Sequence, residues 1–152
     1  MSPEETLTKL GYALPTPTRP VAAYVPTVRT GNLVYVAGQL PFVDGKLPKT
    51  GRLGEGVALE EGQTFARQCV LNALAALKVE IGELARVKRV VRVGAFVASA
   101  DGFTDQPKVA NGASELLVQV FGDAGRHARA AVGVNVLPLG APVEVELLVE
   151  IG

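Results

Sequence analysis

The chain has 152 residues, which suits a single domain with a sizeable core, and 48% of them are hydrophobic. Its 15 lysines and arginines balance 15 aspartates and glutamates, so broad binding to a nucleic-acid backbone is disfavoured. No apolar run approaches the roughly 20 residues that span a bilayer, no secretory signal pattern is visible, and the single cysteine excludes an internal disulfide. We therefore expect a cytoplasmic protein that does not insert into membranes.

The first residues predict a short helix. Ser2 suits the N-cap, Pro3 suits the first helical position, and Glu5 completes a capping box. The helix should end by Gly11, because the following prolines impose an extended stretch; these are Pro15, Pro17 and Pro20.

A first β-hairpin is predicted next. The segments Ala22 to Thr30 and Leu33 to Gly38 are rich in β-forming residues, and Gly31-Asn32 between them suits a tight turn. The second segment is apolar on both of its alternating faces. That pattern is typical of a strand covered from both sides.

Two amphipathic helices flank a long predicted strand. A helical period runs from about Leu59 to Ile81, Val87 to Ser99 is a β-branched run, and a second helix should extend from near Pro107 to Phe121. Cys69 falls in the apolar stripe of the first helix, which is typical of a core thiol rather than a nucleophile. The second helix should bury Val109 or Ala110, Ala113, Leu116, Leu117 and Val120.

The last two dozen residues predict two half-buried strands. Arg129 to Leu137 and Val143 to Ile151 both alternate strictly, and the short Pro/Gly link between them predicts an antiparallel hairpin. Arg129 begins the first strand and Glu144 the second. An arginine fork can hold a carboxylate, and a glutamate can orient water or relay a proton, although strand-end charges are commonly solvated.

The predicted order is therefore ββαβαββ, an α+β fold with one mixed sheet and two helices on one of its faces. The other face is also rich in valine and alanine, and no segment is left to cover it. We therefore expect the protein to self-associate through that face.

Several kinds of site are excluded or disfavoured. One histidine and one cysteine cannot build a Cys/His zinc site, so we expect no metal and no cofactor. No phosphate-binding loop or nucleophile-elbow motif has the required spacing. A basic cluster lies next to acidic residues near the start of the long predicted strand; its members are Arg86, Lys88, Arg89 and Arg92. This mixture of charges favours a solvated surface over an RNA-binding site.

Several segments together resemble the RidA/YjgF family of small imine deaminases, also called the L-PSP endoribonuclease family. The similarity covers about residues 19 to 151, in order and spacing, and the motifs are specific as a set. They are Tyr24, Thr30 to Pro41 with its Gly38-Gln39 pair, Gln68 to Leu74, Val87 to Val97, Asn111, Ala128-Arg129 to Pro138, and Val143 to Glu146.

The resemblance implies a fold, an assembly and an activity. The fold is chorismate-mutase-like and assembles as a homotrimer with clefts between subunits. In the activity, water adds to the C=N bond of reactive 2-imino acids, giving a 2-keto acid and ammonia. The implied catalytic residues are the carboxylate-binding Arg129, the water-positioning Glu144 and the cleft tyrosine Tyr24. Implied substrate contacts are Arg129, Asn111, Ala37, Gly38 and Ala131.

The sequence departs from the active deaminases at two of these positions. Ala37 stands where a serine is usual, and Ala131 where a cysteine is usual. Residues 1–18, with the predicted short helix, resemble the N-terminal extension of a longer subgroup, and residues 19–152 form the domain proper. His127, two residues before Arg129, is interpreted as a rim histidine without a catalytic role.

Three functions stay open at this point. The first is hydrolytic deamination of small 2-imino acids. The second is a non-catalytic trimer that binds a small 2-imino or 2-keto carboxylate, which the two alanines favour. The third is an endoribonuclease or translation inhibitor, which the neutral charge and the lack of a second histidine disfavour.

Overall fold

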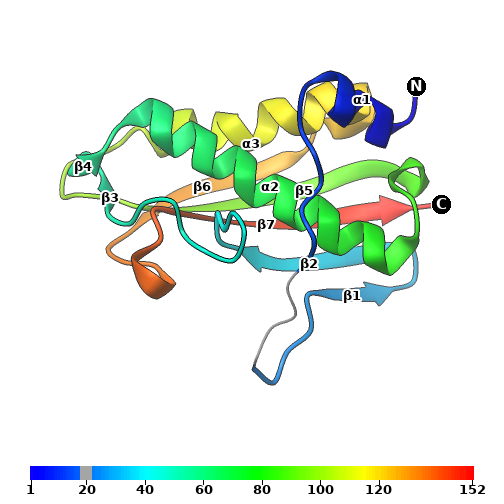
Figure 1. The fold of residues 1–152 in the computed structure, drawn as a ribbon, viewed down its shortest axis with the longest axis horizontal. Coiled ribbons are helices and arrows are strands. Elements are labelled where there is room, and N and C mark those ends of the chain that lie inside the picture. Colours follow the sequence, from blue (N-terminus) through cyan, green and yellow to red (C-terminus); the bar gives the residue numbers. More distant parts are fainter. Residues whose placement is uncertain (18–21) are drawn as a thin grey trace.

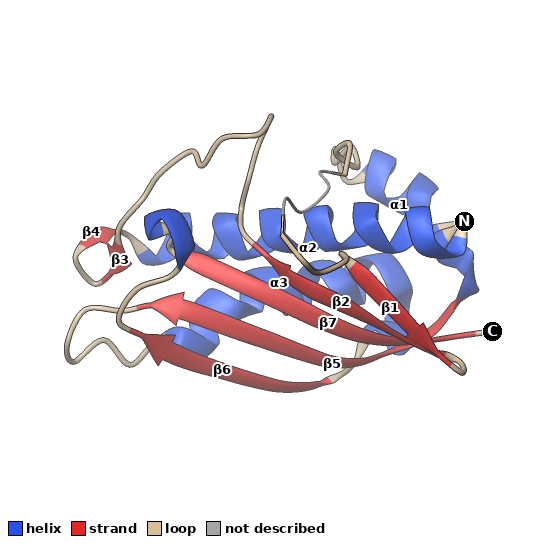
Figure 2. Cartoon of the chain, turned by 90° about the horizontal axis from the view of Figure 1, so that it is seen from below, coloured by secondary structure: helices blue, strands red, loops and turns tan. Residues whose placement is uncertain are grey.

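The computed structural model describes residues 1–17 and 22–152. Over these residues one mixed five-stranded sheet carries two long helices on one face, with a short N-terminal helix and a small two-stranded sheet beside them (Figures 1 and 2). The elements are α1 (Pro3–Lys9), β1 (Thr27–Thr30), β2 (Leu33–Gln39), β3 (Arg52–Leu53), β4 (Gly56–Val57), α2 (Leu59–Ile81), η1 (Leu84–Arg86), β5 (Val87–Ala98), α3 (Gln106–Phe121), η2 (Gly122–Gly125), β6 (Ala128–Val134), η3 (Pro138–Gly140) and β7 (Val143–Ile151). The predicted α+β class is confirmed. Pro20 and the predicted boundary between residues 18 and 19 lie outside the described residues.

The main sheet has the strand order β1-β2-β7-β5-β6. Strands β5 and β6 are parallel, and the other neighbours are antiparallel. The predicted hairpin of the last two strands is therefore wrong, because β5 lies between β6 and β7 and pairs with both (Figure 2). The predicted first hairpin is confirmed: Thr30 pairs with Leu33 across the turn.

The connection from β6 to β7 crosses the end of β5 instead of turning back on itself. Ala98, the last residue of β5, donates its amide to the carbonyl of Pro142 at 2.9 Å. The next residue, Ser99, donates its amide to the carbonyl of Val134, also at 2.9 Å. Skipping one strand means spanning about 10 Å, which a short segment can cover. Leu139, in the left-handed region at φ 60°, bends this segment through η3.

Both long helices cover the same face of the sheet. On that face Val34 and Val36 of β2 are at most 2% exposed, together with the inward side chains of β7, namely Val143, Val145, Leu147, Val149 and Ile151. On the opposite, open face, Tyr35 is 54% exposed and Val132 is 46% exposed. The prediction that Leu33 to Gly38 is covered from both sides is not met within one chain, because none of the helices in residues 1–17 and 22–152 lies on the open face.

Local signals determine where most elements begin and end. Helix α2 covers the predicted residues and stops at Gly82, whose φ of 90° suits glycine. Cys69 is fully buried, as predicted for a core thiol. Strand β1 begins at Thr27 rather than Ala22, since Pro26 has no amide to donate; its carbonyl accepts from the Ala37 amide at 2.9 Å.

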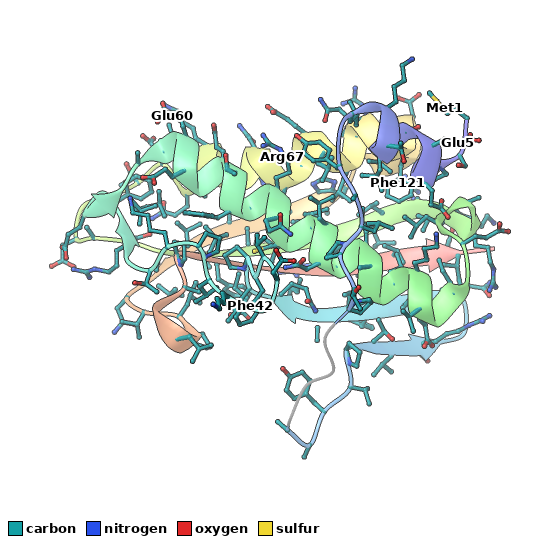
Figure 3. All side chains as sticks on the ribbon, in the orientation of Figure 1. Met1, Glu5, Phe42, Glu60, Arg67 and Phe121 are labelled. Carbon is teal, nitrogen blue, oxygen red and sulfur yellow. The ribbon has the colours of Figure 1, made fainter. Side chains whose placement is uncertain are left out.

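The N-terminal helix α1 docks onto the helical layer. Its capping box forms as predicted, with the Glu5 amide donating to Ser2 Oγ at 3.1 Å. Leu7 is 1% exposed, and Glu4 accepts from the Leu84 amide at 3.3 Å, so the extension is packed into the core. On the outer side of the helical layer, the side chain of Glu60 in α2 points away from the sheet (Figure 3). None of the helices in the described residues combines the length and apolar composition that crossing a membrane requires.

Helices α2 and α3 approach each other closely at Gly112, where a Cβ atom would overlap the backbone of Gln63. We expect Gly112→Ala to destabilise the fold by roughly 1–3 kcal/mol, because a helix backbone cannot move aside cheaply, even though alanine is the better helix former. Urea unfolding measures the change. The control Val79→Ala, at a 74% exposed position of α2, should shift stability by less than about 0.5 kcal/mol. Equal midpoints for the two variants would contradict this close approach.

Candidate functional site

Arg129 lies on the edge strand β6, on the sheet face that the helices cover. Its register partner on β5 is the fully buried Val93, so the arginine extends toward α3. There its Nη1 atom donates to Asn111 Oδ1 at 2.9 Å and to Ser114 Oγ at 3.1 Å. Asn111 and Ser114 are three residues apart and share one face of α3. The structure thus brings together two of the predicted site residues, Arg129 and Asn111.

Two residues that the sequence analysis did not assign to the site complete this cluster. Ser114 Oγ lies 2.9 Å from Nε2 of His127, and Nδ1 of the same ring lies 2.6 Å from the carbonyl oxygen of Gly125. The i, i+3 spacing of Asn111 and Ser114 was the available signal, but only the packing of α3 on β6 shows that both reach one arginine.

Glu144 occupies a different place, on the open face of β7. Its carboxylate lies against Gly38, where any Cβ would overlap it. Gly38 and Ala37 sit in the irregular part of β2 between Val36 and Gln39, where the pairing register shifts. Partial burial raises the pKa of the Glu144 carboxyl, and the nearby negative charge of Glu146 raises it further. Glu144 and Gly38 therefore form a second half of the predicted site.

Tyr24 and Ala131 belong neither to the hydrogen-bonded cluster around Arg129 nor to the contact between Glu144 and Gly38. Tyr24 is 58% exposed in the loop that precedes β1, at the sheet edge opposite to β6. Ala131 pairs with Ala95 of β5 and packs against the core under the helices. It shares a face with Arg129, two residues away, but has no polar group to offer a ligand.

Arg129 and Glu144 do not meet within one chain. Arg129 pairs with Val93 and Glu144 with Phe96, so they are three residues apart along β5 and on opposite faces of the sheet. Strand geometry puts their Cα atoms roughly 14 Å apart. The sheet itself separates the two side chains.

Other features of the described residues carry less chemistry. Burial raises the pKa of the Cys69 thiol, with the charge of Glu144 adding to the effect. Among the described residues, no group of three or more His, Cys, Asp and Glu side chains could hold a metal ion. A cavity of about 310 Å³ has Phe42 and Asn72 in its lining, but Asn72 uses its amide nitrogen on the carbonyls of Leu40 and Phe42.

Known proteins resemble the chain over almost its whole length. It is 48% identical over 146 residues to protein TCP17 of Trypanosoma cruzi, covering 95% of this chain and 91% of the relative. It is 29% identical over 151 residues to a 2-iminobutanoate/2-iminopropanoate deaminase of Dermatophagoides farinae, covering 99% of each. The crystal structure of a "putative endoribonuclease" from Shewanella oneidensis matches with a TM-score of 0.96 and 35% identity, covering 99% of this chain and 100% of that one.

The family model described as "YjgF/chorismate mutase-like, putative endoribonuclease" matches residues 4–151. The mixed sheet with both long helices on one face is the arrangement that this description implies. The chain therefore belongs to the RidA/YjgF family and has its chorismate-mutase-like fold.

Proposed function

We propose that the protein hydrolyses small 2-imino acids to 2-keto acids and ammonia, with Arg129 holding the substrate carboxylate. One observation carries the proposal. The guanidinium of Arg129 is anchored by two neutral oxygens, those of Asn111 and Ser114, and among the described residues it has no carboxylate partner. A positive charge that is fixed in place and not neutralised is suited to an anionic ligand.

Glu144 is the group proposed to handle the water. Its raised pKa makes the carboxylate a stronger base than an ordinary glutamate. It takes a proton from water as the oxygen attacks the carbon of the protonated imine, and passes this proton to the nitrogen of the carbinolamine. Ammonia then leaves as the C–N bond breaks, and the hydroxyl group loses its proton to the freed carboxylate as the C=O bond forms. Tyr24 is proposed to orient the water or the substrate. Asn111 fixes Arg129, and Ala37, Gly38 and Ala131 leave room beside the substrate.

The split site supports assembly as a homotrimer with clefts between subunits. Arg129 and Glu144 lie on opposite faces of one sheet, so one small substrate can touch both only if they come from different chains. The open face offers the apolar surface for such packing, with Val28 at 53% and Tyr35 at 54% exposed. We place this trimer in the cytoplasm.

Binding without turnover is the second candidate function. Ala37 uses its backbone amide on the Pro26 carbonyl, and the methyl group of Ala131 packs against the core. Neither side chain can hydrogen-bond a reacting group, whereas the active deaminases that the chain resembles have serine and cysteine there. A pocket of this kind would still bind the carboxylate of a ligand but would polarise the reacting group less. The same trimer would then act as a metabolite-binding protein.

Arg129→Ala should lower kcat/KM for 2-iminobutanoate at least about 100-fold, because two charge-assisted hydrogen bonds to the carboxylate are lost. The imine is generated in situ by an amino-acid oxidase, and semicarbazide traps what the protein has not hydrolysed. Arg29→Ala, at an exposed arginine of β1, is the matched control and should behave like wild type. No hydrolysis by wild type, together with Arg129-dependent binding of 2-oxobutanoate, would favour the binding protein.

The pH profile tests the role of Glu144. Ionised Glu144 is the active form, so activity should rise with pH through a pKa above the usual 4.5. Glu146→Gln removes the neighbouring negative charge that helps to raise the pKa of the Glu144 carboxyl. Its pKa should fall, and the rising limb of kcat/KM should move to lower pH. A limb that stays in place in Glu146→Gln would argue against Glu144 as the base.

A further inference from the structure

A single chain of hydrogen bonds runs from Arg129 into the protein. Arginine can only donate, so Ser114 Oγ accepts from Nη1, and its own hydroxyl hydrogen is free to donate to Nε2 of His127. The carbonyl of Gly125 can only accept, so Nδ1 of the ring carries the remaining proton. In the singly protonated ring this proton on Nδ1 leaves Nε2 as the acceptor of the Ser114 hydroxyl, so every link is satisfied.

The far end of this chain is held rigidly. Gly125 is buried at the end of η2, and a Cβ there would overlap the backbone of Leu117 in α3. The carbonyl that orients His127 is thus fixed to the helix that also carries Asn111 and Ser114. The guanidinium of Arg129 is therefore held against α3 and the end of η2 together.

The same contacts determine which edge of the guanidinium is free. Both N–H groups of Nη1 are used, one on Asn111 and one on Ser114. Of the five N–H groups of an arginine, those on Nε and Nη2 remain. They form the side-on fork that matches the two oxygens of a carboxylate.

We propose that Ser114 and His127 are positioning residues that lock Arg129 so that its Nε–Nη2 edge receives the substrate carboxylate. The inference rests on the proposed function. It assigns neither residue to bond making, because the Ser114 oxygen already accepts from a cation, which weakens it as a nucleophile. Losing Ser114 removes one of the two anchors of Nη1, and losing His127 removes the partner that orients the Ser114 hydroxyl, so either change loosens the guanidinium.

A spectroscopic test uses the fact that His127 is the only histidine of the chain. In the full-length ¹⁵N-labelled protein, long-range proton–nitrogen correlation reports this one imidazole. Wild type should show a ring that carries a proton on Nδ1, and 2-oxobutanoate should shift its nitrogen resonances. Ser114→Ala should shift Nε2 and abolish most of the response to 2-oxobutanoate. A ring whose only proton is on Nε2, or nitrogen resonances that 2-oxobutanoate does not shift, would overturn the inference.

Affinity and kinetics give the second test. Ser114→Ala and His127→Phe should each weaken 2-oxobutanoate binding and raise KM roughly 3- to 10-fold, with a smaller effect on kcat. Ser114→Thr keeps the hydroxyl and His127→Gln keeps an acceptor, so both should recover most of the affinity. Gln119→Ala, at an exposed position of α3, is the control. Thermal unfolding midpoints identify variants that are merely unstable.

The outcomes separate this inference from the proposed function. Wild-type affinity in both Ser114→Ala and His127→Phe, while Arg129→Ala binds nothing, would overturn the positioning role alone. Undiminished binding by Arg129→Ala would overturn the proposed function itself.

Discussion

The pairing of β5 with both β6 and β7 is the constraint on which the rest of the structure depends. It makes β6 an edge strand, which leaves Arg129 beside α3 rather than in the middle of the sheet. It also places β7 at the centre of the sheet, with Glu144 on the open face. The two halves of the predicted site therefore lie on opposite faces of one sheet.

The local elements were predictable because their signals are local. Gly82, the capping box of Ser2 and the Gly31-Asn32 turn each act within a few residues, and all three appear where expected. The last hairpin failed because alternation reports which side chains share a face, not which strands are neighbours. The division of the chain into residues 1–18 and 19–152 stays a prediction.

The candidate site was predictable in part. The strand pattern singled out Arg129 and the resemblance added Asn111, and the structure joins them through one hydrogen bond. Ser114 and His127 could not be assigned, because their contact depends on how η2 and β6 pack on α3. What results is a cation supported by neutral acceptors. Such a support fixes its position and leaves its charge for a ligand.

Subunit complementation tests the central claim, that Arg129 and Glu144 act on one substrate from different chains. Arg129→Ala and Glu144→Gln subunits, each nearly inactive alone, would be unfolded together in equal amounts and refolded. If each cleft takes Arg129 from one subunit and Glu144 from another, roughly a quarter of the clefts regain both residues, and imine hydrolysis returns to about that fraction of wild type. Activity no greater than the average of the two separate variants, in a sample shown to contain mixed oligomers, would contradict the account.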